Sequence, residues 1–235
     1  MATQKLNAIQ LRLTAVSLLR DLKSIYTYKQ LSQLLGFPES LLCRYVSGTT
    51  IPSESNSQII IEKLSNPEVV ASVVHELISI ESDGYVDTSK IYLYPQLLEL
   101  SLNVLLTNKR CSADSYDKVI TVVQNGVPLA ALVAHITKKP LVIVKKRKES
   151  VTQEYYEEPI RESDGSISFL YLRKDLVQKG DRFLFVDDLI RTGRTLSSVR
   201  KLVERAGGVI NGALVLISVD ESFSSLQGLK VCKLL

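Results

Sequence analysis

The 235-residue sequence has no tryptophan, one methionine, two histidines and three cysteines. The cysteines lie far apart without a CxxC pair, and so few cysteines and histidines argue against a structural zinc site. No apolar run approaches the roughly 18 uncharged residues that a membrane-spanning helix needs, and the N-terminus lacks the pattern of a secretory signal. We therefore expect a cytoplasmic protein with no membrane contact and no disulfide bonds.

Acidic residues are scarce at the start of the chain. Residues 1–53 carry six basic and two acidic side chains, whereas residues 54–235 carry 23 of each, so the net charge of +4 lies in the first quarter. This surplus does not prove an anionic partner, but it indicates where one would bind. Apolar residues make up 45% of the chain and charged residues 23%, which allows a buried core and excludes a disordered polyelectrolyte. At about 150 residues per domain, the length allows one large domain or two small ones.

The first fifty residues have the pattern of short helices separated by glycine. Apolar residues three and four positions apart predict a first helix with one buried stripe: Leu6, Ile9, Leu13, Val16 and Leu19. A second helix would begin after the N-cap Thr27 and end at Gly36, and a third would run to Gly48. Such a pair is a helix-turn-helix, whose second helix fits the major groove of DNA. A small helical bundle that only packs or dimerises has the same pattern.

This segment resembles the Cro/repressor-like helix-turn-helix family over about residues 10–65, because Ile51-Pro-Ser-Glu and a helix at 57–64 follow the second glycine. The resemblance implies binding to double-stranded DNA, and RNA binding has less support because no aromatic stacking motif is present. We expect Phe37, Leu42 and Tyr45 to face inward. The residues that would then contact DNA are Lys29, Glu39, Ser40, Cys43, Arg44, Thr49 and Thr50.

A connector separates this segment from the rest of the chain. Asn66-Pro67 opens a helix in which apolar residues from Val70 to Ile80 share one side, and Glu81-Ser-Asp-Gly84 ends it. We therefore predict a helix-turn-helix domain at 1–66, a connecting helix and linker at 67–88, and a second domain at 89–235.

From residue 118 onward, short apolar runs alternate with helical stretches. Strands are predicted at 119–123, 141–144, 183–186 and 213–217, and helices at 128–137 and 196–206. This alternation predicts an α/β fold with a parallel sheet and helices on its faces. Ligands bind such sheets beyond the carboxyl ends of the strands.

One loop at a strand end carries both acids and hydroxyls. In Phe183-Leu-Phe-Val-Asp-Asp-Leu-Ile-Arg-Thr-Gly-Arg-Thr195, two carboxylates follow a buried strand and suit hydrogen bonds from vicinal hydroxyls. The following residues enter a helix whose free N–H groups suit a phosphate. An acidic surface turn before an ordinary helix is the alternative.

This stretch resembles the phosphoribosyl pyrophosphate (PRPP) motif of type I phosphoribosyltransferases, and the likeness extends over about residues 89–235. It implies a type I phosphoribosyltransferase fold with a hood, in which Asp187 and Asp188 contact the ribose hydroxyls. The residues implied around the 5′-phosphate are Arg191, Thr192, Gly193, Arg194 and Thr195. Arg191 and Arg194 depart from the small residues usual in the family, and each either adds a cation for phosphate or crowds the pocket.

The loop after the first strand of this domain contains Gln124, Asn125 and Gly126. In the family this loop binds pyrophosphate through backbone N–H groups, which requires a glycine for close approach. Lys146 is the implied pyrophosphate lysine, with a solvated basic run as the alternative. Residues 149–174, with a turn at Asp164-Gly165, match the family's mobile loop, and 97–105 and 218–235 would build the rest of the hood.

The two halves together resemble bacterial purine repressors and, more closely, archaeal GfcR-type phosphoribosyltransferase-like regulators. This implies a homodimeric transcriptional regulator that senses PRPP or a related phosphorylated metabolite. Since no histidine follows His135, the His-Gly of the orotate enzymes' loop is missing, and we expect a sensor rather than an enzyme. The alternative is an active orotate- or purine-type transferase that carries a DNA-binding domain. Mg²⁺ would arrive with PRPP, and neither a protein-bound metal nor an organic cofactor is expected.

Overall fold

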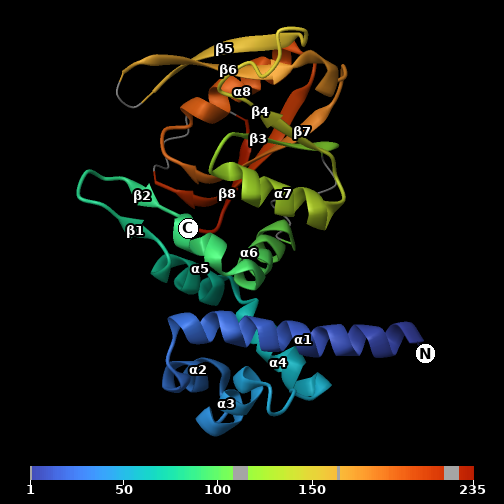
Figure 1. Cartoon of the computed structure of the whole chain (residues 1–235), viewed down its shortest axis with the longest axis vertical. Coiled ribbons are helices and arrows are strands. Elements are labelled where there is room, and N and C mark those ends of the chain that lie inside the picture. The colour runs from blue at the N-terminus through green and yellow to red at the C-terminus, as the bar shows by residue number, and fades with distance from the viewer. Residues whose placement is uncertain (1, 108–115, 163–164, 220–227) are drawn as a thin grey trace. The chain divides into compact units, whose positions relative to one another are not determined.

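The computed structural model describes residues 2–107, 116–162, 165–219 and 228–235. Its contacts divide the chain into two compact units, Met1–Val104 and Leu105–Leu235, which we call the helical unit and the α/β unit (Figure 1). The division falls later than the expected boundary between residues 88 and 89. One reason is that the Asp21 carboxylate accepts hydrogen bonds from the backbone N–H groups of Gln96 and Leu97 (3.2 and 3.3 Å). These bonds hold the start of the next long helix against the helical unit.

The helical unit consists of consecutive helices and one small hairpin. Its elements are α1 (Ala2–Ile25), α2 (Tyr28–Leu35), α3 (Glu39–Ser47), α4 (Glu54–Leu64), α5 (Pro67–Glu76), β1 (Ser79–Ile80), β2 (Val86–Asp87), η1 (Ser89–Leu93) and most of α6 (Pro95–Thr107). Thr27 and Gln30 form a reciprocal capping box at the start of α2. Helices α2 and α3 end at Gly36 and Gly48 with φ of 75° and 78°, a conformation that glycine adopts without strain. The predicted cap and both predicted helix ends are confirmed.

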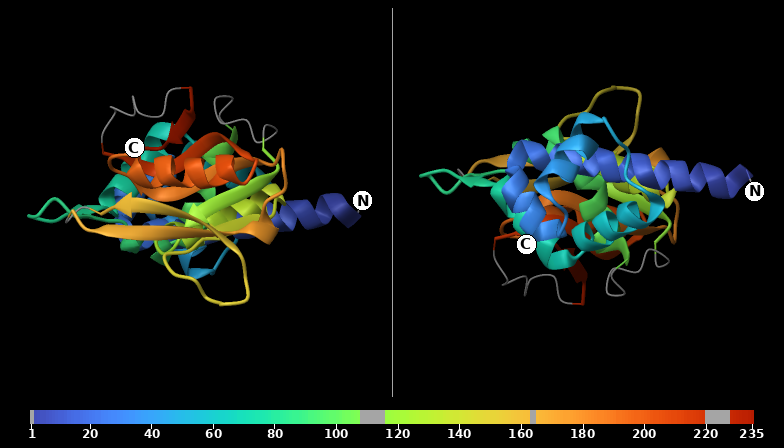
Figure 2. Two further views of the ribbon diagram at one scale, coloured as in Figure 1. Left: turned by 90° about the horizontal axis from the view of Figure 1, so that it is seen from above. Right: turned by 90° about the horizontal axis from the view of Figure 1, so that it is seen from below.

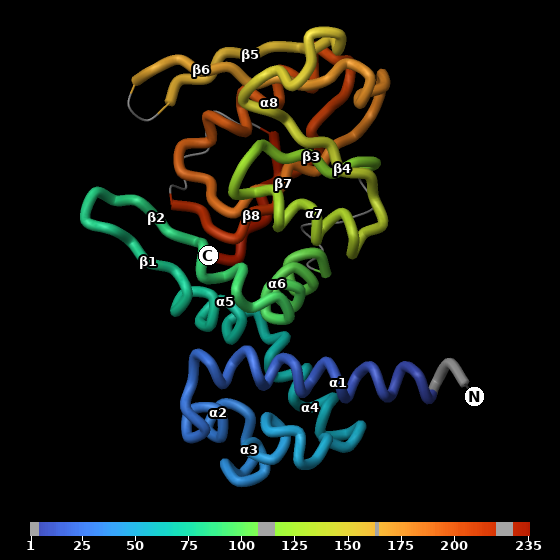
Figure 3. Tube along the Cα trace, in the orientation of Figure 1, coloured from blue at the N-terminus to red at the C-terminus, as the bar shows by residue number. Residues whose placement is uncertain are grey.

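The core of the helical unit lies between the second half of α1 and helices α2 to α5. Fully or almost fully buried side chains there include Leu18, Leu19, Leu22, Leu31, Leu35, Leu42, Ile60 and Leu64. The predicted stripe along α1 is wrong in its first half, because Leu6, Ile9 and Leu13 are 63%, 52% and 52% exposed. The first turns of α1 extend beyond the other helices of this unit, so nothing in the unit covers them (Figure 3). Ile80, predicted to lie inside, is exposed on β1, since α5 ends at Glu76.

The α/β unit is built on a five-stranded parallel sheet, as predicted. Its strands, in the spatial order β4-β3-β7-β8-β9, are β4 (Leu141–Val144), β3 (Lys118–Val122), β7 (Arg182–Ile190), β8 (Val209–Ser218) and β9 (Lys230–Lys233). In register, Ile120 of β3 pairs with Val142 on one side and Phe185 on the other. The carboxyl ends of β3 and β7 therefore lie next to each other.

Two helices cover the sheet, α7 (Gly126–Thr137) and α8 (Arg194–Arg205). The connections β3–α7–β4 and β7–α8–β8 run in opposite directions from the middle of the sheet, and right-handed crossovers then place α7 and α8 on opposite faces (Figure 2). Leu196, Val199 and Leu202 of α8 are buried in the core, and Leu129 and Val133 of α7 are buried as well. Both helices begin at the carboxyl edge of the sheet, where their N-termini can face a ligand.

Residues 149–174, matched to the family's mobile loop, contain a hairpin whose strands flank the predicted turn at Asp164-Gly165. Strands β5 (Tyr155–Arg161) and β6 (Ile167–Arg173) pair antiparallel, and Leu170 and Leu172 are fully buried in the core. Arg205 of α8 donates to the Glu157 carbonyl oxygen and to the Glu158 carboxylate (2.6 and 3.1 Å). Apolar packing and these bonds hold the hairpin on the unit. Asp164 of the predicted turn lies outside the described residues.

Two further expectations about the end of the chain are corrected. The tail expected in the hood instead contributes β9 to the edge of the sheet, since residues 230–233 pair with β8. Cys232 is disulfide-bonded, which overturns the expectation of a chain free of disulfides. Among the described residues, the helices are too short or too polar to cross a membrane.

Candidate functional site

The loop between β7 and α8 encloses a small cavity. About 120 Å³ in volume, it is lined by Asp187 and by residues 191–195. Gly193, with φ of 70°, precedes the first residue of α8, and no side chain caps this helix. The first N–H groups of α8 are therefore available to an anion, and the helix dipole favours negative charge there. The structure thus brings the predicted phosphate residues around one hollow.

The predicted acid pair lies inside β7, which continues to Ile190, so this strand is longer than the predicted 183–186. Asp188 is 4% exposed and Asp187 is half-buried, with its Oδ1 accepting a hydrogen bond from the Asp188 N–H (3.1 Å). Burial raises the pKa of Asp187 well above its ordinary value, and the Asp188 carboxylate raises this pKa further. A ligand that donates hydroxyl hydrogen bonds would stabilise the ionised form. The pair therefore suits a vicinal diol.

The loop after β3 touches this acid pair through Gly126. A Cβ added to Gly126 would lie 2.5 Å from Asp187 Oδ1 and 2.7 Å from Thr121 Oγ1, so only glycine fits there. The Val123–Gln124 peptide is cis, and Gln124 and Asn125 are exposed. Helix α7 begins at Gly126 without a side-chain cap. Two uncapped helix N-termini thus lie at neighbouring strand ends.

Thr121 is a member of this site that the sequence analysis did not identify. It is fully buried in β3, and its Oγ1 has no hydrogen-bond partner among the described residues. A buried hydroxyl without a partner is costly, which is typical of a position that serves a function. The available signal was a polar residue in the middle of the apolar run Val119-Ile-Thr-Val122.

The arginine of the phosphate loop contacts both the loop and the hairpin. Arg194 Nε donates to Thr192 Oγ1 (3.0 Å), and Arg194 Nη1 donates to the Glu162 carbonyl oxygen (3.3 Å). Glu162 Oε1 accepts from Lys146 Nζ (3.3 Å) and from Ser168 Oγ (2.6 Å). Lys146, the predicted pyrophosphate lysine, is therefore linked to the phosphate loop through Glu162, a residue missed in the sequence. Arg191 is exposed and lines the cavity.

A metal ion would have few protein ligands at this site. Within the described ranges, no group of three or more His, Cys, Asp or Glu side chains lies close enough to hold a metal. The raised pKa of Asp187 also favours its neutral form, which is a poor metal ligand. The residues present fit an ion that arrives with a ligand's own oxygen atoms better than a resident ion.

In the helical unit, the outer face of α3 matches the predicted arrangement. Leu42 and Tyr45 are buried and Phe37 is half-buried. The predicted DNA-facing residues are all exposed: Lys29, Glu39, Ser40, Cys43, Arg44, Thr49 and Thr50. Their exposure permits binding, and their role in it stays a prediction.

Arginines of α1 support this face from behind. Arg20 Nε donates to the carbonyl oxygen of Val46, at the end of α3 (2.9 Å), and Arg12 Nε donates to that of Pro52 in the following loop (2.7 Å). Both guanidinium groups bond to neutral oxygens, so their charge is not cancelled by a carboxylate. Residues 1–53, which include α3, carry six basic and two acidic side chains, so this part of the helical unit is net positive.

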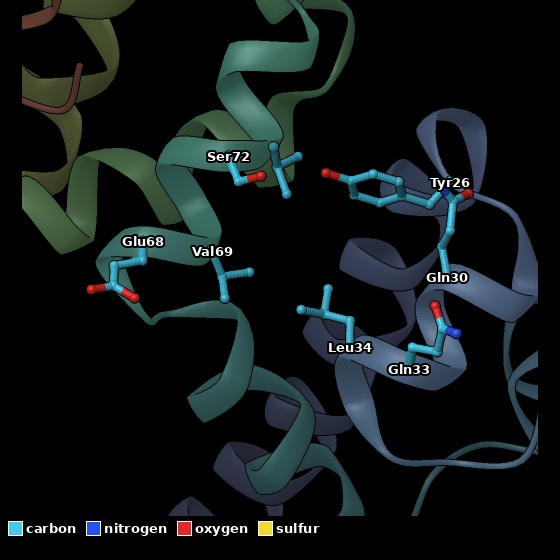
Figure 4. Close-up of a pocket in the computed structure, with 8 residues that line it drawn as sticks. Tyr26, Gln30, Gln33, Leu34, Glu68, Val69 and Ser72 are labelled. Atoms are coloured by element: carbon cyan, nitrogen blue, oxygen red, sulfur yellow. The ribbon is translucent and has the colours of Figure 1, made fainter.

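A groove between α2 and α5 is the second hollow, which we call the α2–α5 groove (Figure 4). Its volume is about 470 Å³. Apolar parts of Tyr26, Leu34, Val69 and Val73 line it, and polar residues at its edge are Gln30, Gln33, Glu68 and Ser72. None of these residues belongs to the predicted DNA-facing set.

Comparison with known proteins gives the family of the α/β unit. The model of the family described as "Phosphoribosyl transferase domain" matches residues 98–222, more than half of the chain. The chain therefore belongs to this family, and the predicted phosphoribosyltransferase fold is confirmed.

The relatives described here are named as transferases. Over 136 residues (57% of this chain and 67% of the relative), the chain is 33% identical to a hypoxanthine/guanine phosphoribosyltransferase of Methanocella paludicola. It is 30% identical over 142 residues to an orotate phosphoribosyltransferase of Pyrococcus furiosus (60% and 69%). An adenine phosphoribosyltransferase structure from Thermoanaerobacter pseudethanolicus has a TM-score of 0.63 at 22% identity, covering 70% of this chain and 98% of that one, and shows the fold alone. These names fit the predicted alternative, an active transferase, better than a sensor without catalysis.

Proposed function

We propose that the α/β unit binds PRPP and transfers its phosphoribosyl group to an oxopurine, hypoxanthine or guanine. The observation that carries this proposal is the position of Asp187, which borders the phosphate cavity and lies against Gly126 of the loop after β3. A ribose held by the acid pair would place its 5′-phosphate at the start of α8 and its pyrophosphate at the start of α7.

In this reaction the bond between ribose C1′ and the pyrophosphate oxygen breaks, and a bond from C1′ to a base nitrogen forms. Pyrophosphate leaves with the electron pair, and the base nitrogen loses its proton. The acid pair would orient the ribose, and the N–H groups at the start of α7 would stabilise the leaving charge. Mg²⁺ brought by PRPP would neutralise part of that charge.

The choice of base rests on two observations. Several relatives, including the first described above, are named for hypoxanthine and guanine. In addition, residues 149–174 contain no histidine, so a loop like that of the orotate enzymes is missing. Both favour an oxopurine over orotate.

Pyrophosphate release tests the proposal directly. The protein is incubated with PRPP, Mg²⁺ and one base at a time from hypoxanthine, guanine, adenine and orotate. We expect release with an oxopurine, and a loss of about 100-fold or more in Asp187→Asn/Asp188→Asn. Asp175→Asn is the matched control, because Asp175 is an exposed acid paired with Arg173. PRPP binding without turnover on any base would contradict a transferase, and absence of PRPP binding would contradict any PRPP site.

As a second candidate we propose a DNA-binding regulator that senses PRPP, because the polar face of α3 is exposed and residues 1–53 carry four more basic than acidic side chains. Each recognition helix of a dimer would contact a half-site about 34 Å from the other. PRPP would change DNA affinity only by its differential affinity for the two states, typically ~1–3 kcal/mol of coupling.

Fluorescence anisotropy separates this candidate from the first. A labelled duplex from the region upstream of the protein's own gene is compared with a random duplex of equal length, with and without PRPP. Tighter binding of the first duplex, altered by PRPP, supports regulation. Equal affinity for both duplexes at every salt concentration contradicts it.

A further inference from the structure

The first half of α1 is an apolar helix face without a partner in its own unit. Leu6, Ile9 and Leu13 lie three and four residues apart and therefore share one side of the helix. Each is more than half exposed. The first side chain of α1 that bonds elsewhere in the unit, among those described, is Arg12, and the first buried one is Ala15. We call this segment, residues 5–13, the α1 arm.

The arm continues the packed second half of α1 as one 24-residue helix. Its three large apolar side chains on one face leave an unfavourable exposed surface. Figures 2 and 3 show the first turns of α1 projecting beyond the other helices of its unit. A partner that covers the stripe would stabilise both the arm and the protein.

The α2–α5 groove has the complementary properties. Tyr26, Leu34 and Val69 are half-buried around it, so it offers an apolar floor that a helix face can cover. Glu68 is the acidic residue that lines the groove, and no lining residue is basic. The arm carries Lys5 and no acid, while its Arg12 bonds to the Pro52 carbonyl oxygen of its own unit. The two surfaces therefore match in both hydropathy and charge.

The arm of one chain does not reach the groove of the same chain. The groove begins at Tyr26, just after the end of α1, about 25 Å along the helix from Ile9 at 1.5 Å per residue. We propose that two copies of this chain form a dimer by exchanging arms, with the stripe of each copy in the α2–α5 groove of the other. Such an exchange is reciprocal and closed, so both copies cover both surfaces. It does not depend on the function proposed above.

Sedimentation equilibrium over a series of concentrations tests the exchange. We expect the wild-type protein to dimerise, and Ile9→Asp or Val69→Arg to raise the dimer dissociation constant by about 30-fold or more. Ile59→Asp is the matched control, an isoleucine that is 40% exposed on α4, and it should leave the dimer intact. Monomeric variants should still melt cooperatively, at a lower temperature that reflects the lost packing of the arm, which would show that association is lost and folding is kept. A monomeric wild type, or dimers that persist in both variants, would overturn the proposal.

Cross-linking identifies the two surfaces. In a Cys43→Ser background, which removes the exposed free thiol, Ile9→Cys and Val69→Cys are placed on separate chains, mixed and oxidised. Efficient formation of a disulfide between chains only in the mixture supports the exchange. Cross-linking of the Ile9→Cys variant with itself at equal yield would mean that stripes pair with stripes, and would overturn it.

Discussion

The two units of the chain use their charged groups in opposite ways. Among the described residues, all ten ion pairs lie in the α/β unit, for example Lys118–Asp181 at 2.7 Å and Arg182–Asp117 at 2.8 Å. The described part of the helical unit has none, and three of its cations, Arg12, Arg20 and Lys63, bond to backbone carbonyl oxygens. The α/β unit therefore pairs many of its cations with its own acids, whereas the excess of basic over acidic side chains in residues 1–53 of the helical unit is open to an external anion.

The candidate sites of the two units differ in burial as well. Asp188, Thr121 and Gly126 are buried in the α/β unit, while Glu39 and Arg44 are exposed in the helical unit. A substitution in the first site therefore alters packing and binding together. One in the second site alters binding alone. The following four experiments test this difference.

The largest effect is expected for Gly126→Ala. The added Cβ would overlap Asp187 Oδ1 and Thr121 Oγ1, so the loop must move, and we expect PRPP affinity to fall by about 100-fold with a lower melting temperature. Calorimetry and thermal melting measure the two effects. Gly212→Ala is the control, because its nearest neighbour would lie 3.4 Å away in ordinary contact. If Gly126→Ala binds PRPP as tightly as the wild type, the loop after β3 is not part of the PRPP site.

Arg44→Ala tests the opposite behaviour in the helical unit. We expect DNA affinity to fall by about 30-fold, since one good base contact contributes about 1–3 kcal/mol, while melting stays unchanged because the side chain is exposed. Anisotropy titrations measure the affinity. Lys174→Ala, which removes a cation paired with Glu154 in the α/β unit, should leave DNA binding within twofold. An equal loss of DNA affinity in Arg44→Ala and Lys174→Ala would contradict a DNA contact specific to the helical unit.

The pH dependence of Asp187 gives the third effect. Its pKa is raised in the folded chain, so the native state holds this proton to higher pH than the unfolded state. The free energy of unfolding should therefore fall as pH rises from about 4 through the raised pKa. PRPP binding should release a proton and strengthen with pH over the same window, by at most about tenfold per pH unit.

Calorimetry in two buffers of different ionisation enthalpy measures this proton release, and melting from pH 4 to pH 8 measures the stability. In Asp187→Asn, the melting temperature should no longer fall for this reason between pH 4 and pH 8. A wild-type melting temperature that stays constant over this range would contradict a buried ionisable Asp187.

The smallest effect compares two arginines. Arg12→Ala removes a partly buried charged hydrogen bond to the Pro52 carbonyl oxygen and should lower the free energy of unfolding by about 1 kcal/mol. Arg200→Ala breaks an exposed pair with Glu204 and should cost about 0.3–0.5 kcal/mol. Urea denaturation measures both. A larger loss of unfolding free energy in Arg200→Ala than in Arg12→Ala would contradict the inference that the Arg12 bond to a carbonyl oxygen is the stronger contact.

Local signals in the sequence were enough for most of the fold. Thr27, Gly36 and Gly48 have side-chain and backbone preferences that act within a few residues, so their predicted positions are confirmed. The parallel sheet followed from apolar runs, and the acid pair from its place after one of them. These features depend on neighbours in sequence.

The failures depend on contacts between distant residues. The stripe at Leu6 and Ile9 has helical spacing whether or not another helix covers it, so periodicity alone could not show that it is exposed. The pairing of β9 with β8 and the link from Lys146 through Glu162 to Arg194 likewise require the folded chain. Exposed polar residues such as Ser40 gave no sign of their function beyond their position.

The length of α1 has one more consequence. Its 24 residues span about 36 Å, close to the ~34 Å of one turn of B-DNA. In an arm-exchanged pair, the rigid α1 helices would set the distance between the two α3 helices, because no flexible linker would lie between them. The number of turns in α1 would then determine which half-site spacing the pair tolerates, independently of which bases α3 contacts.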